Sequence, residues 1–268
     1  MSRFATAGLF LVAAIFLSST TQAQEPYKPV PYMPGRDVLW VPTPPVLVEK
    51  MLDMAQVTAN DVVIDLGSGD GRMVIAAARR GARTRGVEYN PKLVELSQRL
   101  AKEAGYADKA IFVEGDMYKA DISDATVLPL FLMTENLDDL VPQFLKLRPG
   151  TRIVNNGFEF SYWEFDEIAQ LEGTACERWC VAYLYIVPAQ VAGVWRFDRG
   201  ELELKQEFQN LTGTMTIDGK RLPIERGRLQ GDMIRFSVDK RRYTGRVAGN
   251  TIAGYMSGEG MGPWRVER

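Results

Sequence analysis

Apolar and amphipathic segments alternate through the middle of the chain and predict strands and helices in turn. Short apolar stretches, several of them interrupted by polar residues, predict strands, which lie at 62–66, 83–89, 111–117, 126–132, 151–155 and 181–187. Apolar residues spaced three and four apart predict helices, which lie at 46–57, 73–80, 91–104 and 137–147. Strands that alternate with helices form parallel sheets through right-handed crossovers. The pattern therefore predicts an α/β fold with a mostly parallel sheet, whose last strand, 181–187, lies antiparallel at the edge.

The pattern changes at Gly193, where short segments alternate between apolar and polar residues. Turn dipeptides separate these segments, at Asp218-Gly219, Gly231-Asp232 and Gly249-Asn250. An apolar-x-Gly-x-apolar pattern also recurs, and glycines inside strands are typical of strongly bent sheets. We therefore expect two domains, an α/β domain over residues 46–189 and a small antiparallel meander or barrel over 193–268.

The first 23 residues have the three parts of a secretory signal peptide. Arg3 supplies a positive charge, residues 4–17 are mostly apolar, and small residues precede a cleavage point after Ala23. An uncleaved membrane anchor is the alternative, although the apolar run is short for a bilayer span. We expect export to the periplasm, a mature chain that begins near Gln24, and no transmembrane span after cleavage.

Composition and charge narrow the classes of function. Hydrophobic residues make up 46% and charged residues 25% of the 268 residues, which is ordinary for a soluble protein. The formal net charge of −2 divides into −6 for residues 1–189 and +4 for 190–268, and neither part is basic enough to indicate nucleic-acid binding.

The two cysteines, Cys176 and Cys180, do not predict a metal site. The chain has no histidine, and two thiolates alone do not complete a tetrahedral zinc set. Export would permit the two to form a disulfide. Two separate buried thiols agree equally well with the sequence.

The most informative segment joins the first strand to the next helix through three glycines, Gly67, Gly69 and Gly71. Glycine permits positive φ and a close approach of backbone to a ligand, and the N-terminus of the following helix binds polar or anionic groups. A dinucleotide fingerprint, G-x-G-x-x-G, would need a glycine at Arg72, so the spacing argues against NAD. A tight turn without a ligand is the alternative for these glycines.

Acidic residues also end the next two predicted strands. Glu88 lies in the strand 83–89, where a carboxylate would reach ribose hydroxyls, and Asp116 lies near the end of 111–117. Ligands of open α/β sheets bind beyond the carboxyl ends of the strands. These acids and the glycine loop therefore predict one site for a nucleotide-like cofactor.

Together these features resemble the class I S-adenosylmethionine (SAM) methyltransferases. Four segments are similar, in more detail, to the ATP synthase c-subunit lysine methyltransferase family and its prokaryotic relatives: Val41–Pro44, Asp65–Arg72, Gly86–Pro91 with Leu93 and Val94, and Gly157–Trp163. The resemblance covers roughly residues 40–165. It implies a Rossmann-like domain that binds SAM.

The resemblance also implies a role for each part of the site. The glycine loop would hold the methionine moiety and the ribose, Glu88 would accept hydrogen bonds from the ribose hydroxyls, and Asp116 with the Met117 backbone would recognise adenine. The implied SAM-binding residues are Asp65, Gly67, Ser68, Gly69, Asp70, Gly71, Glu88, Tyr89, Asp116 and Met117. The proline-rich arm, residues 24–45, would close over the cofactor with the first helix, and a simple linker is the alternative.

Glu135 and Asn136 follow the fourth predicted strand, where a methyl group and its acceptor would meet. We take both as candidate catalytic residues, because Glu135 is placed to help a lysine acceptor lose its proton. The resembled family carries a less acidic sequence here, and a solvated helix cap is the alternative. The aromatic run 157–163 either forms the wall of an alkylamine pocket or packs in the core.

The sequence thus predicts an exported SAM-dependent methyltransferase that N-methylates a protein side chain, a lysine. Two alternatives stay open: a SAM-fold binding protein without transfer activity, since SAM is made in the cytoplasm, and an envelope interaction protein whose β-domain carries the function. The expected partner is a protein or small-molecule methyl acceptor and no nucleic acid. The oligomeric state is left open.

Overall fold

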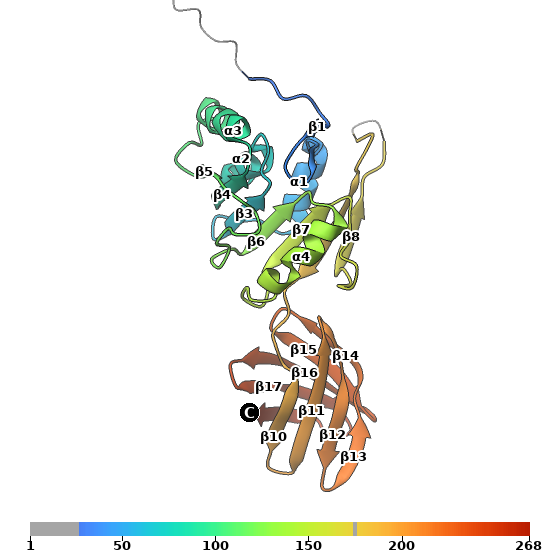
Figure 1. Cartoon of the computed structure of the whole chain (residues 1–268). Coiled ribbons are helices and arrows are strands. Elements are labelled where there is room, and N and C mark those ends of the chain that lie inside the picture. The colour runs from blue at the N-terminus through green and yellow to red at the C-terminus, as the bar shows by residue number, and fades with distance from the viewer. Residues whose placement is uncertain (1–26, 174–175) are drawn as a thin grey trace, which may run out of the picture.

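The computed structural model describes residues 27–173 and 176–268, which fold into two lobes (Figure 1). The N-terminal lobe holds a sheet flanked by helices, and the C-terminal lobe contains strands only (Figure 1). The predicted signal segment, 1–23, lies outside the described residues. Within the described ranges, every helix is too short or too polar to cross a membrane.

The sheet of the N-terminal lobe has seven strands in the order β5-β4-β3-β6-β7-β9-β8. Their bounds are β3 Val62–Leu66, β4 Arg83–Glu88, β5 Ala110–Glu114, β6 Val127–Leu130, β7 Arg152–Asn156, β8 Glu167–Gln170 and β9 Val181–Ile186. Strands β3 to β7 pair in parallel, and β9 runs antiparallel to β7 and β8. The mostly parallel sheet predicted from the sequence is confirmed.

The predicted position of the last strand is wrong. β9 is antiparallel, as expected, but it lies inside the sheet, and β8 forms the edge. The sequence did not predict β8 because only Ile168 and Ala169 of its four residues are apolar and none of the four is fully buried. An edge strand with solvent on one side needs no continuous apolar run.

Four helices cover the two faces of this sheet, with the bounds α1 Pro45–Met54, α2 Arg72–Arg79, α3 Pro91–Glu103 and α4 Thr134–Phe144. Helices α1 and α2 pack on one face, α3 continues that layer over β5, and α4 packs on the opposite face. Helix α3 begins as the sequence predicts, since the Asn90 side chain accepts a hydrogen bond from the Lys92 N–H at 3.0 Å and Pro91 occupies the first turn.

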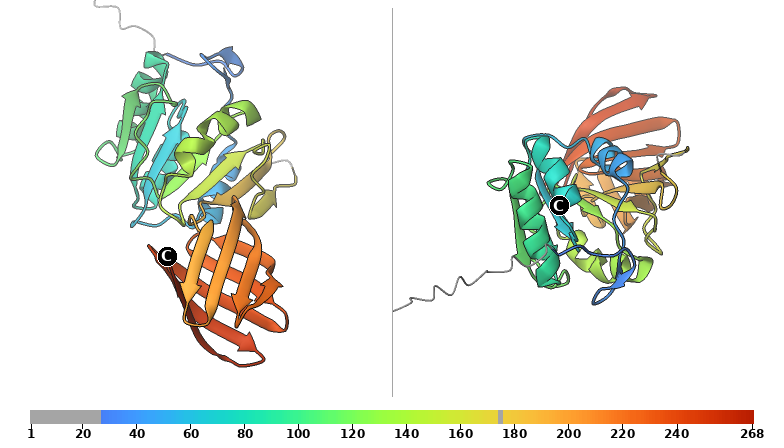
Figure 2. Two further views of the ribbon diagram at one scale, coloured as in Figure 1. Left: turned by 60° about the horizontal axis from the view of Figure 1, so that its bottom comes forward. Right: turned by 90° about the horizontal axis from the view of Figure 1, so that it is seen from above.

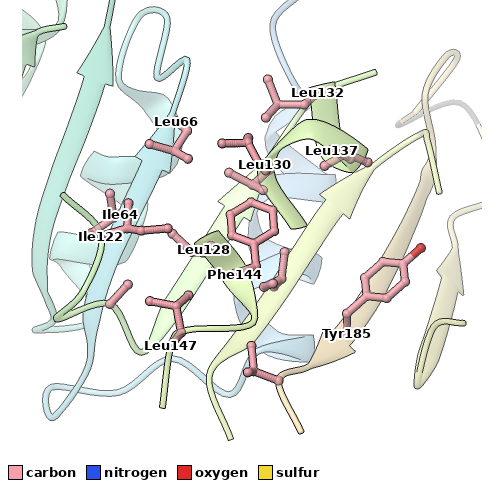
Figure 3. Packing of buried hydrophobic residues seen from close by; sticks show 14 of the residues in the cluster. Ile64, Leu66, Ile122, Leu128, Leu130, Leu132, Leu137, Phe144, Leu147 and Tyr185 are labelled. Carbon is pink, nitrogen blue, oxygen red and sulfur yellow. The ribbon is translucent and has the colours of Figure 1, made fainter. Parts of the chain in front are cut away.

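Alternation along β3 divides the core into two layers. Ile64 and Leu66 face the α4 side, where they belong to one cluster with Leu130 and Phe144 (Figure 3). Val63 points the other way and packs with the apolar side chains of α1 and α2. Because both faces are covered, every residue of β3 is buried, which is why four of its five residues are apolar.

The C-terminal lobe is a closed antiparallel barrel. Its strands are β10 Gly193–Phe197, β11 Gly200–Glu207, β12 Asn210–Ile217, β13 Lys220–Pro223, β14 Glu225–Gln230, β15 Met233–Val238, β16 Arg241–Ala248, β17 Thr251–Gly258 and β18 Gly262–Glu267. Each strand pairs with the next in sequence except β13 with β14, and β10 closes the circle by pairing with β18. Because β13 and β14 pair with successive parts of β12, the segments form an eight-stranded barrel. The predicted small β-domain is confirmed.

Large side chains fill the barrel interior. Trp195 and Phe236 are almost fully buried, and Phe236 stacks on Tyr243 with ring centroids 4.9 Å apart. Gly213 of β12 lies so close to the paired strand β11 that a Cβ atom would come within 1.9 Å of the Glu203 carbonyl oxygen. Glycine is needed there for the bend, as the recurring glycine pattern indicates.

The barrel is attached to the end of the sheet opposite the N-terminal arm (Figure 2). Arg228 of β14 donates to the Glu164 carboxylate at 2.9 Å and to the Asp166 carboxylate at 3.2 Å. Phe208 stacks on Trp163 at 5.3 Å with an angle of 11° between the rings. The segment that follows β7 therefore holds the barrel.

Candidate functional site

A large cavity lies beyond the carboxyl ends of the first parallel strands. With its opening to solvent it measures about 1030 Å³. The glycine loop and the ends of β4, β5 and β6 form one side of it. Residues 33–43 of the N-terminal arm form the other, including the short hairpin of β1 Met33–Pro34 and β2 Leu39–Trp40.

The glycine loop is held by hydrogen bonds from its backbone. The N–H groups of Gly67 and Ser68 both donate to the Val87 carbonyl, at 2.8 and 3.0 Å. Gly69, with φ of 56°, presents its Cα face to the arm, where a Cβ would come within 2.6 Å of Trp40 Nε1. The loop therefore packs tightly between β4 and the arm, and this close packing requires a glycine at position 69.

Gly71 differs from the other two glycines, because it does not line the cavity. Its φ is 78°, and a Cβ there would come within 2.5 Å of the Phe112 ring on β5. Gly71 serves the packing of the loop and α2 against the sheet. The other nine implied SAM-binding residues all line the cavity, namely Asp65, Gly67, Ser68, Gly69, Asp70, Glu88, Tyr89, Asp116 and Met117.

Glu88 joins the two loops that frame the cavity. One carboxylate oxygen accepts the Gly69 N–H at 2.9 Å, and the other accepts the Asn90 N–H at 2.8 Å. A carboxylate has about four acceptor positions, so two are left for ligand hydroxyls. The geometry is compatible with the ribose contact implied by the sequence.

Asp116 connects the arm to the end of β5. Its carboxylate accepts the Tyr118 N–H at 3.0 Å and an Arg36 N–H at 2.9 Å. The Tyr118 hydrogen bond and then the Arg36 guanidinium hold the pKa of Asp116 below its ordinary value. The same guanidinium lies 4.7 Å from the centre of the Tyr89 ring. Arg36 thus fastens the arm across the cavity between two of the implied site residues.

Asp65 is the most perturbed acid of the site. Its side chain is only 7% exposed, and burial, followed by the negative charges of Glu88 and Asp70, raises its pKa to about 8. No ion pair joins it to a Lys or Arg within the part of the chain that the structure describes. A buried, unpaired acid that lines a cavity is typical of a functional site.

Arg72 was not among the residues singled out in the sequence, except as the residue that replaces a glycine. It donates to the Asp70 carboxylate at 2.6 Å and to the Thr43 carbonyl at 2.9 Å, so it links the glycine loop to the arm. Arg36 and Trp40 were also missed. The proline-rich composition of the arm indicated an extended segment but not which of its side chains enter the site.

Glu135 and Asn136 lie in the first turn of α4 and do not line the cavity. Glu135 is exposed, where a negative charge interacts favourably with the helix N-terminus. Asn136 is buried and donates to the Tyr118 hydroxyl at 2.8 Å. The structure therefore does not bring this pair together with the nine cavity residues.

The residues of the cavity fit SAM by their chemistry. Asp65, Glu88 and Asp116 supply acceptors for hydroxyl, amine and ammonium groups, and Met117 and Leu93 supply apolar wall. The Ser68 hydroxyl is buried without a hydrogen-bond partner among the described residues, which leaves a polar group for a ligand.

Comparison with known proteins gives the same answer. The family model for the ANTKMT methyltransferase domain matches residues 65–167. A protein-lysine N-methyltransferase of Saccharolobus islandicus is 36% identical over 161 residues, which cover 59% of this chain and 96% of that protein. The mouse ATP synthase c-subunit lysine N-methyltransferase is 35% identical over 105 residues, 39% of this chain but only 42% of the mouse protein.

Among solved structures, an RNA methyltransferase from Salinibacter ruber in complex with S-adenosyl-L-homocysteine is 44% identical, with a TM-score of 0.53. The match covers 56% of this chain and 96% of that one. The fold and the cavity define a class I SAM-dependent methyltransferase, and SAM is its cofactor. Within that class the chain belongs to the family of the ANTKMT methyltransferase domain and the Saccharolobus lysine methyltransferase.

Proposed function

We propose that this protein is an exported protein-lysine N-methyltransferase. The observation that carries the choice of acceptor is the relative from Saccharolobus islandicus, which is named a protein-lysine N-methyltransferase and is matched over 96% of its length. The mouse relative is likewise named for a lysine of a protein. A lysine side chain is therefore the acceptor that these relatives support best.

In this proposal the chain holds the cofactor with the residues already described. Glu88 accepts from the ribose hydroxyls, Asp116 and the Met117 backbone lie at the adenine, and the positive charge of the bound cofactor would favour ionisation of the Asp65 carboxyl. When bound, SAM supplies an activated methyl group on a sulfonium. The protein must then align a neutral amine with that group, and alignment can provide most of the rate enhancement.

A second candidate is an RNA methyltransferase, because the Salinibacter protein that is 44% identical carries that name. The charge of this chain argues against it, since residues 1–189 carry a formal net charge of −6. RNA binding depends strongly on neutralising phosphates with Lys and Arg. The exposed apolar side chains Tyr32, Leu39 and Met133 near the cavity favour a protein acceptor instead.

The proposed export is supported by the signal-like residues 1–23 and by the cysteines. Cys176 and Cys180 form a disulfide in the structure, with Cα atoms 5.8 Å apart. Disulfides persist in oxidising compartments outside the cytoplasm. N-terminal sequencing of the protein from a periplasmic fraction should begin near Gln24, whereas a chain that begins at Ser2 in a cytosolic fraction would overturn the export.

Methyl transfer tests the activity and the acceptor together. The mature protein and methyl-labelled SAM are incubated in separate reactions with an envelope protein extract, with poly-lysine and with total RNA. We expect label in lysine after acid hydrolysis of the protein samples, and much less at subsaturating SAM for Asp65→Asn or Glu88→Ala. Label in RNA alone would select the second candidate. SAM binding without any transfer would instead identify a SAM-fold binding protein.

A further inference from the structure

A second cavity adjoins the proposed SAM cavity and differs from it in chemistry. It measures about 650 Å³ with its opening, and every side chain that lines it is apolar or aromatic. It shares Val38, Leu39, Val41 and Phe131 with the first cavity, so the two meet across these residues. The first cavity is lined by several carboxylates, whereas no charged residue of the described ranges lines the second.

Three aromatic rings form the inner wall of the second cavity. Phe158 and Trp179 have ring centroids 5.2 Å apart, and Phe131 lies 5.8 Å from Trp179 and 6.4 Å from Phe158. They come from separate places in the chain, just after β6, just after β7 and just before β9. Because β9 is antiparallel, its first residues lie at the same end of the strands as the last residues of β6 and β7. The sheet topology therefore places the three rings beside the proposed SAM cavity.

The opening of this cavity is unusually apolar. Of the side chains that line the cavity, Tyr32, Leu39, Met133 and Trp179 are also exposed to solvent, at 48%, 54%, 39% and 38%. Exposed apolar residues that are scattered singly need no explanation, but a group around one opening indicates a binding surface. The side chains at the rim would contact the residues that flank an acceptor.

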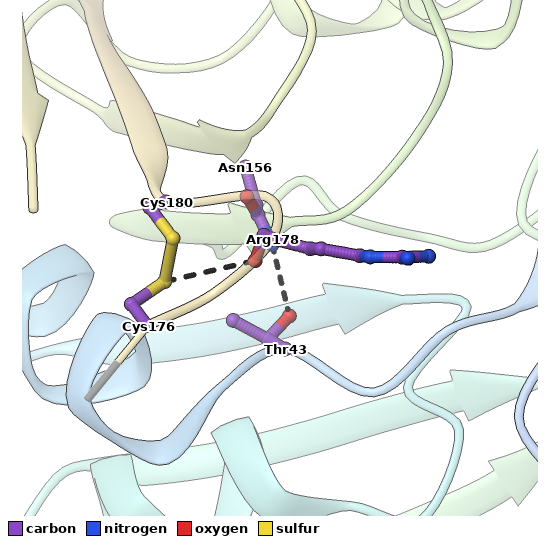
Figure 4. Close-up of a disulfide and its surroundings, with 5 residues drawn as sticks. All are labelled: Thr43, Asn156, Cys176, Arg178 and Cys180. Atoms are coloured by element: carbon purple, nitrogen blue, oxygen red, sulfur yellow. Dashed lines mark hydrogen bonds between the residues drawn. A yellow bond between two sulfur atoms is a disulfide. The ribbon is translucent and has the colours of Figure 1, made fainter. Parts of the chain in front are cut away.

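The disulfide Cys176–Cys180 encloses Trp179 in a short loop (Figure 4). Within this loop Trp179 has a positive φ of 58°, which non-glycine residues adopt rarely. Its indole ring packs on Gly157 at the end of β7, where a Cβ would come within 3.1 Å of the ring. Figure 4 also shows the hydrogen bond that Asn156 Nδ2 donates to Thr43 Oγ1, at 3.5 Å. The rarely adopted backbone conformation of Trp179 persists because the surrounding loop holds it, and the loop thereby fixes the position of the indole ring.

We infer that the second cavity receives the methyl-acceptor side chain, with its amine between Phe131, Phe158 and Trp179, and that the Cys176–Cys180 disulfide keeps Trp179 in that wall. This inference rests on the proposed lysine methyltransferase function and names its acceptor site. An apolar cavity lowers the pKa of an entering amine and favours the neutral form that accepts a methyl group. Aromatic faces also attract alkylammonium groups, including methylated lysine, so the cavity admits lysines that already carry methyl groups.

Binding of small lysine analogues to the full mature chain tests this site apart from activity. The probes are the Nα-acetyl amides of Nε-trimethyllysine, lysine and norleucine, titrated in the presence of saturating S-adenosyl-L-homocysteine and followed by calorimetry. We expect trimethyllysine to bind more tightly than norleucine. Trp179→Leu should weaken trimethyllysine roughly fivefold to thirtyfold, as the loss of a cation–π contact implies, and Trp179→Phe should weaken it less. Tyr162→Leu, which removes an 83% exposed aromatic outside the cavity, is the matched control and should change nothing.

The disulfide is tested in the same titration. Dithiothreitol should weaken trimethyllysine binding to the wild type but leave the Cys176→Ser/Cys180→Ser variant, already weak, unchanged. Equal affinity of the oxidised, reduced and double-serine proteins would overturn the role of the disulfide, and wild-type affinity of Trp179→Leu would overturn the acceptor site. Displacement of the probes by adenosine or by RNA would show that the rings stack a base instead.

Affinity for S-adenosyl-L-homocysteine is measured for every variant and separates the two proposals. Trp179 does not line the SAM cavity, so its variants should keep the wild-type affinity. Normal cofactor affinity with no binding of lysine analogues would refute this inference and leave the methyltransferase intact. Binding of the analogues without transfer to any lysine substrate would count against the proposed function instead.

Discussion

Replacement of Asp65 by asparagine should stabilise the cofactor-free protein, by an amount that grows with pH. The pKa of Asp65 is about 8 in the folded chain, against 3.8 for an ordinary aspartate. Between these values the folded state holds a proton that the unfolded state has released, so unfolding releases a proton and the free energy of unfolding falls as pH rises. Asparagine has a similar shape and does not titrate.

The magnitude follows from the size of the shift. Each pH unit between the two pKa values changes the free energy of unfolding by about 1.4 kcal/mol, so the advantage of Asp65→Asn should grow from about 2 kcal/mol at pH 5 to about 4 kcal/mol at pH 7. Above pH 8 the folded carboxylate is ionised as well, and the difference should level off.

Urea unfolding of the wild type and Asp65→Asn at a series of pH values measures this difference. The helical signal in far-ultraviolet circular dichroism follows the N-terminal lobe, since all four helices of the described ranges lie there. The difference between the two proteins cancels the titration of every group that does not interact with Asp65. A gain in stability that is the same at pH 5 and pH 8 would refute the burial of an unpaired carboxyl at this position. The same variant should bind SAM more weakly, because asparagine cannot carry the negative charge that favours a cationic ligand.

Three further predictions concern the cofactor and the lobes. Glu88→Ala should weaken SAM binding by about 1.5–3 kcal/mol, the usual worth of hydrogen bonds to a charged group, and unchanged affinity in calorimetry would remove Glu88 from the site. Arg228→Ala should loosen the barrel from the N-terminal lobe by removing its bonds to Glu164 and Asp166, without unfolding either lobe. Small-angle scattering should then report a more extended average shape, and an unchanged profile would contradict the role of Arg228. Residues 193–268 expressed alone should unfold cooperatively, since they supply all of the barrel's buried cluster except Ala189 and Val191, and a disordered spectrum would contradict that independence.

The order of strands and helices was predictable because each element buries a face along its own length. β3 is buried on both sides and reads as an apolar run, and the start of α3 is set by Asn90 and Pro91 through local hydrogen bonding and φ. β8 was not predicted, because this exposed edge strand is stabilised by pairing with β9 and has no apolar pattern. Propensity and hydrophobic periodicity indicate which residues are buried, and no residue of β8 is fully buried.

The glycine loop and the acidic strand ends could be read from the amino-acid order alone, since their spacing follows from the chemistry of one short segment at a time. Which side chains meet in space was settled by the folded chain. The fold brings Arg36 and Trp40 of the arm over the cavity, leaves Glu135 and Asn136 outside it, and pairs Cys176 with Cys180 where the sequence left two possibilities. Contacts between residues distant in sequence depend on sheet order and on the path of the arm, which no local pattern encodes.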